Sequence, residues 1–188
     1  MDLSKAQPDL TTLLHEWRNG NAGAFSVVIN ELYAELKAVA ARQLARRRGA
    51  QTITATELLN EALLGIMNAR PDFENRGHFL ATMSLATRAV LVDHARAQSS
   101  RKRGGDQVQV TFTEGLQGEA PMVLDLLALD QALDQLEELD PRCGKVLHLA
   151  FFAGMSRDDI ADVLEVSPAT VRRDLRFGRA WIEKALSP

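Results

Sequence analysis

The chain has 188 residues, of which 46% are hydrophobic and 25% charged, as expected for one ordinary folded domain or two small ones. No long apolar run occurs, and the N-terminus lacks the basic and then apolar order of a secretion signal, so we expect a cytoplasmic protein with no membrane segment. The single cysteine, Cys143, excludes an intrachain disulfide and leaves too few thiolates for a zinc site.

The net charge of −3 conceals separate basic and acidic segments. Arginine and lysine concentrate in residues 42–48, 96–103 and 172–184, whereas residues 106–140 contain nine acidic residues and no lysine or arginine. Local potential matters more than total charge, so nucleic acid remains a plausible partner. We hypothesise that the acidic segment shields basic surfaces when two parts of the chain close on each other.

Apolar residues recur at steps of three and four along most of the chain, which predicts helices. In the first half we expect helices at about residues 10–19 and 22–48. A third begins within residues 52–64 and ends before Pro71, and a fourth spans residues 79–97. Proline, asparagine and glycine break the pattern between the last two.

Residues 98–123 contain serine, glycine and charged residues without helical periodicity. The stretch VQVTF alternates as a strand would, but one isolated strand is unstable, so we interpret this segment as a flexible linker. Helices are again expected at residues 124–139, 142–153, 156–164 and 168–186. The sequence thus predicts an all-α protein with two small helical domains, residues 8–97 and 124–186, on either side of the linker.

The stretch MSRDDIADVLEVSPATVRRDLRFGRAWIEKAL has the layout of a helix-turn-helix. Ser156 and Ser167 suit helix N-caps, and Pro168 suits the first helical position. Ala161 is small, as needed where two helices cross closely. Glu165 occupies the turn position that usually holds glycine, so the turn must accommodate a side chain there.

Polar and basic residues recur on the expected outer face of the second helix, where they can contact phosphates and base edges in the major groove. The candidate DNA-contacting residues are Ala169, Thr170, Arg172, Arg173, Arg176 and Arg179. The alternative is a charged, solvated face on a plain helical hairpin. Two caps, a small crossing residue and clustered basic groups together favour DNA binding.

This helix-turn-helix resembles region 4 of bacterial sigma factors of the small, two-domain extracytoplasmic-function (ECF) class. The stretches TATELLNEALLGIMN and RGHFLATMSLATRAVLVDHARAQSSRKRGG resemble sigma region 2.2 and regions 2.3 and 2.4, and the similarity covers about residues 8–186. The resemblance implies a factor that binds core RNA polymerase, recognises a promoter and helps to melt it. Residues 124–186 would bind the minus-thirty-five element as duplex, and residues 8–97 would bind the minus-ten element, where bases leave the stack.

The resemblance also indicates which residues of the first domain would contact promoter DNA. Donors and an aromatic ring near residue 75 could hold extruded bases, and two arginines of the next helix could follow the phosphates. The candidates are Asn75, Arg76, His78, Phe79, Arg88 and Arg96. The alternative for the loop is a plain Pro-Asn-Gly connection, and an isolated histidine such as His94 is usually structural.

In this family the region 2.2 helix binds a coiled coil of the polymerase's largest subunits. The candidate polymerase-binding residues are Leu58, Asn60, Glu61 and Leu64, with the two polar residues as specificity points. The alternative is that the leucines all belong to the core, and some must, because one helix cannot present every apolar residue outward.

Many ECF members carry an acidic cluster, Asp-x-Glu-Asp, at the start of this helix, where this chain has Thr54, Thr56 and Glu57. Thr54 and Glu57 match a capping box, which leaves Thr52 and Thr56 unexplained. We hypothesise that a Ser/Thr kinase phosphorylates Thr52, Thr54 or Thr56 and restores acidity for basic groups on the polymerase, with Thr52 favoured as the most accessible. The plain alternative is that Thr54 only caps the helix and polymerase binding needs no acid.

The main alternative function is a conventional dimeric helix-turn-helix regulator that binds duplex DNA by itself. An enzyme finds little support, because the sequence lacks a glycine-rich phosphate loop, a histidine pair at metal spacing and a nucleophile motif. We therefore expect no catalytic residue, cofactor or metal. The expected partners are core RNA polymerase and promoter DNA, with a Ser/Thr protein kinase and an anti-sigma factor as further candidates.

Overall fold

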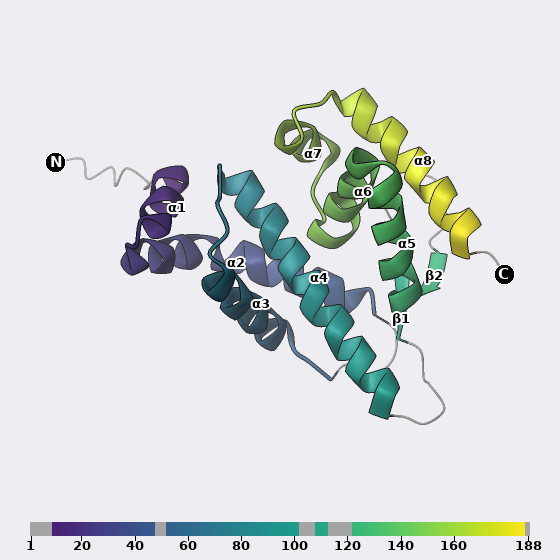
Figure 1. Cartoon of the computed structure of the whole chain (residues 1–188), viewed down its shortest axis with the longest axis horizontal. Helices are drawn as coiled ribbons and strands as arrows, with labels where there is room; N and C mark the ends of the chain where they lie inside the picture. Colours follow the sequence, from purple (N-terminus) through teal and green to yellow (C-terminus); the bar gives the residue numbers. More distant parts are fainter. Residues whose placement is uncertain (1–8, 48–51, 102–107, 113–121, 187–188) are drawn as a thin grey trace.

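The computed structural model describes residues 9–47, 52–101, 108–112 and 122–186, and nearly all of their regular structure is helical. The N-terminal helices form one group and the C-terminal helices a second, with α4 beside both and a short β-hairpin between them (Figure 1). Apart from the hairpin, the predicted all-α fold class is confirmed.

Four helices make up the N-terminal half: α1 Leu10–Arg18, α2 Ala22–Ala45, α3 Ala55–Ala69 and α4 Arg76–Arg101. A polar side chain caps the start of each helix, and the capping residues are Asp9, Asn21, Thr54 and Asn75. The Asn75 carboxamide accepts a hydrogen bond from the backbone N–H of His78 at 2.9 Å. This cap explains why α4 begins at Arg76, three residues before the predicted residue 79.

An aromatic cluster fixes how α1, α2 and the start of α4 meet. Trp17 stacks on Phe25 with ring centroids 4.4 Å apart, and Phe73 meets Phe79 edge-on at 5.0 Å. All four rings are at most 5% exposed. Buried aromatic pairs in these geometries stabilise a fold beyond their buried area alone, so the cluster anchors the loop that precedes α4.

The C-terminal half also contains mainly helices. They are α5 Leu126–Leu139, α6 Pro141–His148, the π-helix η1 Leu149–Ala153, α7 Arg157–Val163 and α8 Pro168–Leu186. The single helix predicted for residues 142–153 is thus an α-helix that widens into a π-helical turn. Every residue of η1 is buried, and π-helical turns of this kind often mark functional positions.

The prediction that VQVTF forms no strand is wrong. Strand β1 Gln109–Phe112 pairs antiparallel with β2 Met122–Asp125, and the backbone N–H of Thr111 also donates to Arg46 O at 2.8 Å. The partner strand lies in residues that we assigned to the linker and to the start of α5. Residues 102–107 and 113–121 of the predicted linker lie outside the described residues, and the domain boundaries remain a prediction.

One face of strand β1 is buried, and its alternate residues are exposed or half-buried. Val110 is 2% and Phe112 0% exposed, and the Phe112 ring lies 4.7 Å from that of Phe151 in η1. The hairpin therefore attaches the chain between the domains to the core of the C-terminal half. Cys143 is likewise a core residue: its side chain is buried, and burial raises the pKa of its thiol to about 12.

The two helical groups pack against each other along a seam formed by α2 and α4 on one side and α5, η1 and α7 on the other (Figure 1). Polar side chains meet there beside the buried apolar residues of η1. Gln43 Nε2 donates to Thr87 Oγ1 at 2.9 Å and to Phe152 O at 3.3 Å. Arg42 Nη2 donates to Ala153 O at 2.7 Å. Side chains of α2 thus donate hydrogen bonds to the last carbonyl groups of the π-helix. Carbonyl groups at the end of a helix have no hydrogen-bond donor within the helix itself.

His148 lies inside this seam and is 3% exposed, with its Nε2 3.4 Å from Ser84 Oγ of α4. Burial, together with the nearby positive charge of Arg88, lowers the pKa of the imidazole to about 3. His148 is therefore neutral at physiological pH, and protonating it requires the surrounding structure to open.

Substituting Gly144 with alanine should destabilise the C-terminal half. A Cβ atom at Gly144 would lie 2.7 Å from the Cα of Glu137 in α5, a backbone atom that cannot move without separating α5 from α6. We expect the free energy of unfolding to fall by about 1–3 kcal/mol. The matched control is Gly65→Ala in α3, where a Cβ meets nothing within 4 Å and helix propensity should add about 0.5–1 kcal/mol. Equal effects of both substitutions in urea denaturation would contradict this packing.

Acidification should destabilise the closed chain through His148. Between its ordinary pKa of 6.5 and its lowered pKa of about 3, the unfolded chain binds a proton that the folded chain does not. The contribution is complete above pH 6.5 and is lost as the pH falls toward 3, amounting to about 2 kcal/mol at pH 5 relative to pH 7.5. Urea unfolding of the wild type and of His148→Gln at both pH values measures it. The wild type should lose more stability than the variant, and identical losses would contradict the assignment.

Candidate nucleic-acid interface

Helices α7 and α8 form the predicted helix-turn-helix, and both predicted N-caps are present. The Ser156 hydroxyl accepts from the backbone N–H of Asp159 at 3.1 Å, and the Asp159 carboxylate accepts from the Ser156 N–H at 3.2 Å. The Ser167 hydroxyl accepts from the N–H of Thr170 at 3.1 Å, with Pro168 as the first residue of α8. These caps fix where each helix begins.

The turn between α7 and α8 carries backbone strain at Glu165, whose φ is 52°. Left-handed backbone costs about 1–2 kcal/mol for a residue with a side chain, and this is the position where we noted the absence of glycine. The Glu165 side chain is exposed, so it meets no steric obstacle. The N–H of Val166 donates to Ala161 O at 3.0 Å and closes the turn despite the strain.

The outer face of α8 presents three exposed arginines, Arg172, Arg173 and Arg176, beside exposed Ala169. Half-buried Thr170 has its hydroxyl 2.9 Å from the Ser167 hydroxyl. The three arginines line an open groove with Arg157 and Asp158 of α7 and with Phe177, which is 55% exposed. The groove therefore combines positive charge with one exposed aromatic ring, a combination suited to a nucleic-acid backbone and base edges.

Arg179 does not belong to this face, and its predicted place on the outer surface is wrong. Its side chain is 11% exposed, and its Nε donates to Glu183 at 2.9 Å. The reason is helical spacing: Arg179 follows Leu175 by four residues, and Leu175 lies on the buried stripe of α8. The arginine head therefore lies along the core side of the helix.

Four of the candidate minus-ten residues, Asn75, Arg76, His78 and Phe79, lie together at the start of α4, but not all are free. Arg76 forms an ion pair with Glu35 of α2 at 2.6 Å, while half-buried His78 accepts from the N–H of Glu74 at 3.3 Å. Phe79 is 0% exposed, so the prediction of an accessible stacking ring does not hold. Phe79 instead supports the loop from within the aromatic cluster.

Helix α7 covers part of this loop. A Cβ atom on Gly77 would lie 2.8 Å from Val163 Cγ2, which shows how closely α4 and α7 approach. Asn75 and Arg76 share a cleft with Asp159 and Asp162 of α7. The helix-turn-helix of one half thus lies against the candidate base-binding loop of the other.

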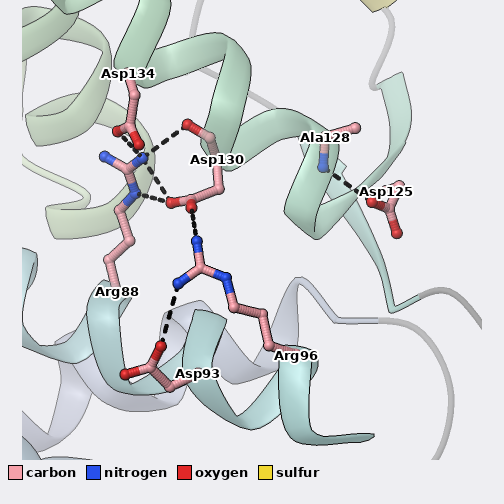
Figure 2. Close-up of polar contacts among 7 residues, drawn as sticks. All are labelled: Arg88, Asp93, Arg96, Asp125, Ala128, Asp130 and Asp134. Atoms are coloured by element: carbon pink, nitrogen blue, oxygen red, sulfur yellow. Dashed lines mark hydrogen bonds and ion pairs between the residues drawn. The ribbon is translucent and has the colours of Figure 1, made fainter. Parts of the chain in front are cut away.

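Arg88 and Arg96 of α4 are both engaged by acidic residues of α5 (Figure 2). Arg88 is 6% exposed; its Nε donates to Asp130 Oδ1 at 2.8 Å and its Nη2 to Asp134 Oδ1 at 2.7 Å. Arg96 Nη2 donates to the second oxygen of Asp130 at 3.4 Å and Nη1 to Asp93 at 3.2 Å. Two residues of the acidic segment thus pair with these arginines; Arg88 is shielded from solvent, whereas the Arg96 side chain stays 58% exposed.

The candidate polymerase-binding residues on α3 divide between core and surface. Leu58 is 0% exposed and belongs to the core, so its assignment to a binding surface is wrong. Leu64 is 59% exposed, and Asn60 and Glu61 are exposed with it. Met67 is 49% exposed, lies one turn beyond Leu64 and extends this surface. The sequence analysis did not name Met67, although its spacing of three residues from Leu64 places both on one helix face. We call Asn60, Glu61, Leu64 and Met67 the α3 face.

The three threonines before and within α3 differ in their surroundings. Thr54 forms the predicted capping box: its N–H and hydroxyl both donate to the Glu57 carboxylate at 2.8 Å, and its hydroxyl accepts from the Glu57 N–H at 3.2 Å. These hydrogen bonds lower the pKa of Glu57. Thr56 is half-buried. Thr52 is exposed and lies in a shallow depression with Glu61, His94 and Asp93.

His94 has a structural partner, since its Nε2 lies 3.1 Å from the Glu61 carboxylate on α3.

Across the residues that the structure describes, no group of three or more histidine, cysteine or acidic side chains could hold a metal ion. Within the same ranges, none of the helices combines the length and the apolar character that crossing a bilayer requires.

Comparison with known proteins adds one strong match. The family model for ECF sigma factors matches residues 7–188, nearly the whole chain. No curated protein matches the chain. The match gives no support to a conventional dimeric regulator. Since it spans both helical halves, the chain belongs to the ECF sigma factor family, whose members are non-enzymatic, promoter-specific transcription initiation factors.

Proposed function

We propose that this sigma factor directs core RNA polymerase to its promoters through surfaces on α8, α4 and α3, and that phosphorylation before α3 switches it on. Residues 8–97 act as region 2 and residues 124–186 as region 4. The observation that carries the proposal is the row of exposed arginines on α8, the second helix of the helix-turn-helix. Residues 7–188, which contain this motif, match the ECF sigma factor family.

The minus-thirty-five element binds along α8 of the helix-turn-helix. Arg172, Arg173 and Arg176 are exposed on one side of the helix, and Ala169 and Thr170 lie at its first turn, which enters the major groove in such motifs. Asp174, which is buried, fixes the base of this surface by accepting from Arg142 Nε at 2.6 Å. The arginine heads are thus presented from a rigid helix rather than from a loop.

The minus-ten element binds at the start of α4. Asn75, Arg76 and His78 supply donors and an imidazole at a loop that Phe79 anchors from below. Arg96, with a side chain 58% exposed, follows the phosphates along the same helix. Arg88 is buried against α5, so it becomes available only when the two halves separate.

Core polymerase binds the α3 face. Leu64 and Met67 supply exposed apolar contacts beside the polar groups of Asn60 and Glu61. Exposed apolar residues at helical spacing, flanked by polar groups, are typical of a surface that another helix covers. An anti-sigma factor remains a candidate competitor for these surfaces, since family members often have one.

Phosphorylation of Thr52 supplies the acidity that α3 lacks. Its hydroxyl is exposed, whereas the Thr54 hydroxyl is engaged in the capping box and Thr56 is half-buried. A phosphate adds about −1.5 to −2 charges, and just before a helix N-terminus it gains about 0.3–1 kcal/mol from the dipole. Two charge-assisted contacts to basic groups of the polymerase would then raise affinity about a hundredfold or more.

Removing the arginine heads of α8 should weaken recognition of the minus-thirty-five element. Each lost base or phosphate contact costs about 1–3 kcal/mol, so Arg172→Ala with Arg176→Ala should reduce holoenzyme binding to promoter DNA at least tenfold. Lys184→Ala is the matched control, an exposed basic residue at the other end of α8. Run-off transcription with purified core polymerase measures the effect. Equal transcription by the double variant and the control would contradict the assignment.

Substituting Thr52 should block activation, with a charged residue restoring it. We expect Thr52→Ala to lose transcription in cells under inducing conditions, and Thr52→Glu to bind core polymerase about tenfold to a hundredfold more tightly than Thr52→Ala. Thr56→Ala is the matched control. Thr54→Ala must be compared at equal stability, because losing the cap costs about 1 kcal/mol. If the alanine variants at all three positions transcribe like wild type, the phosphorylation switch is wrong.

A further inference from the structure

The contact between α4 and α5 points to an autoinhibited free state. We propose that Asp130 and Asp134 act as an intramolecular mimic of promoter phosphates, occupying Arg88 and Arg96 until the two halves separate on core polymerase. The inference rests on the proposed role of α4 in binding the minus-ten element. It goes beyond that role by assigning the acidic face of α5 as a competitor for the same arginines.

The geometry of the cluster matches how guanidinium groups bind phosphate. The two oxygens of Asp130 serve different arginines: Oδ1 accepts from Arg88 Nε at 2.8 Å, and Oδ2 accepts from Arg96 Nη2 at 3.4 Å (Figure 2). Asp134 adds a second carboxylate on Arg88 at 2.7 Å. Carboxylates and phosphates present similar pairs of anionic oxygens to the donors of arginine. One α5 carboxylate therefore bridges two arginines along α4, as a backbone phosphate could.

Because Arg88 is buried, it cannot pair with a DNA phosphate while it pairs with α5. Arg88 and Asp130 are both 6% exposed, and Arg88 also lies over the Phe152 ring at 5.3 Å. A buried guanidinium without an anion is strongly disfavoured, so Arg88 requires either α5 or another anion beside it. While α5 occupies Arg88, a DNA phosphate has no route to it.

The same closure brings α7 against the start of α4, although Asn75 and Arg76 stay exposed. Helix α7 lies so close to Gly77 that a Cβ there would approach Val163 Cγ2 to 2.8 Å, and Asp159 and Asp162 share the cleft of Asn75 and Arg76. The α3 face and the outer face of α8 lie outside the seam and are exposed. The closed chain can therefore meet polymerase and duplex DNA, while buried Arg88 is withheld from the phosphates of the minus-ten element.

Part of the cluster is accessible to solvent, which makes the closure reversible. The side chains of Asp134 and Arg96 are 62% and 58% exposed, so ions and competing phosphates reach them. Exposed ion pairs contribute little and are screened by salt. Opening can thus begin at Asp134 and Arg96 and proceed to the buried Arg88–Asp130 pair.

The first test removes the acidic face of α5. In the full-length chain, Asp130→Asn with Asp134→Asn should open the two halves and raise affinity for a mixed-sequence single-stranded DNA oligonucleotide at least tenfold. Small-angle scattering should show a larger radius of gyration. The control is Glu137→Gln with Glu138→Gln, which removes the same charge from α5 at side chains that make no ion pair among the described residues. Equal effects of the two double variants on shape and DNA affinity would overturn the proposal.

The second test locks the halves together. Cysteines at Gly77 and Val163 lie within reach of one disulfide, and native Cys143 is buried and unreactive. We expect the oxidised Gly77→Cys, Val163→Cys chain to lose run-off transcription with core polymerase at least tenfold, and reductant to restore it. Equal transcription by oxidised and reduced forms would overturn the autoinhibition while leaving the proposed function intact. Failure of the wild type itself to initiate with core polymerase would instead overturn the proposed function.

Discussion

A buried ion pair between Arg88 of α4 and Asp130 of α5 determines how the two halves of this ECF sigma factor meet. Both charges are nearly excluded from water, so the pair tolerates the loss of neither partner. Around it, α2 side chains satisfy the last carbonyl groups of the π-helix, and neutral His148 lies against α4. The seam thus combines hydrogen-bonded and charged groups, which are specific in geometry and sensitive to charge, with the buried apolar residues of η1.

This seam connects the fold to the proposed control of the protein. A purely apolar interface would hold the halves together permanently, whereas hydrogen-bonded and charged groups can exchange one set of partners for another. Arg88 and Arg96 have partners of the same chemistry in α5 and in DNA. The α3 face and α8 remain exposed in the closed chain, so the surfaces proposed to make first contact are those that need no rearrangement.

Local sequence signals predicted most of the helices, because helix periodicity and N-caps depend on neighbouring residues. The capping boxes of Thr54 and Ser156 are examples. The β-hairpin was missed because the strand partner of β1 lies at residues 122–125, and the pairing depends on contacts that a local pattern does not contain. The errors at the candidate site have the same origin. Leu58, Phe79 and Arg179 have suitable chemistry, but tertiary packing turns them toward the core.

The most direct test of this account is the distance between spin labels at Ala97 of α4 and Ala180 of α8, two exposed positions on opposite sides of the seam. Pulsed electron paramagnetic resonance on the free chain should give one short, narrow distance distribution at low salt. Addition of core polymerase should replace it with a longer distance as the Arg88 and Arg96 contacts to α5 break. An unchanged distribution in a transcriptionally active holoenzyme would contradict the claim that the two halves must separate.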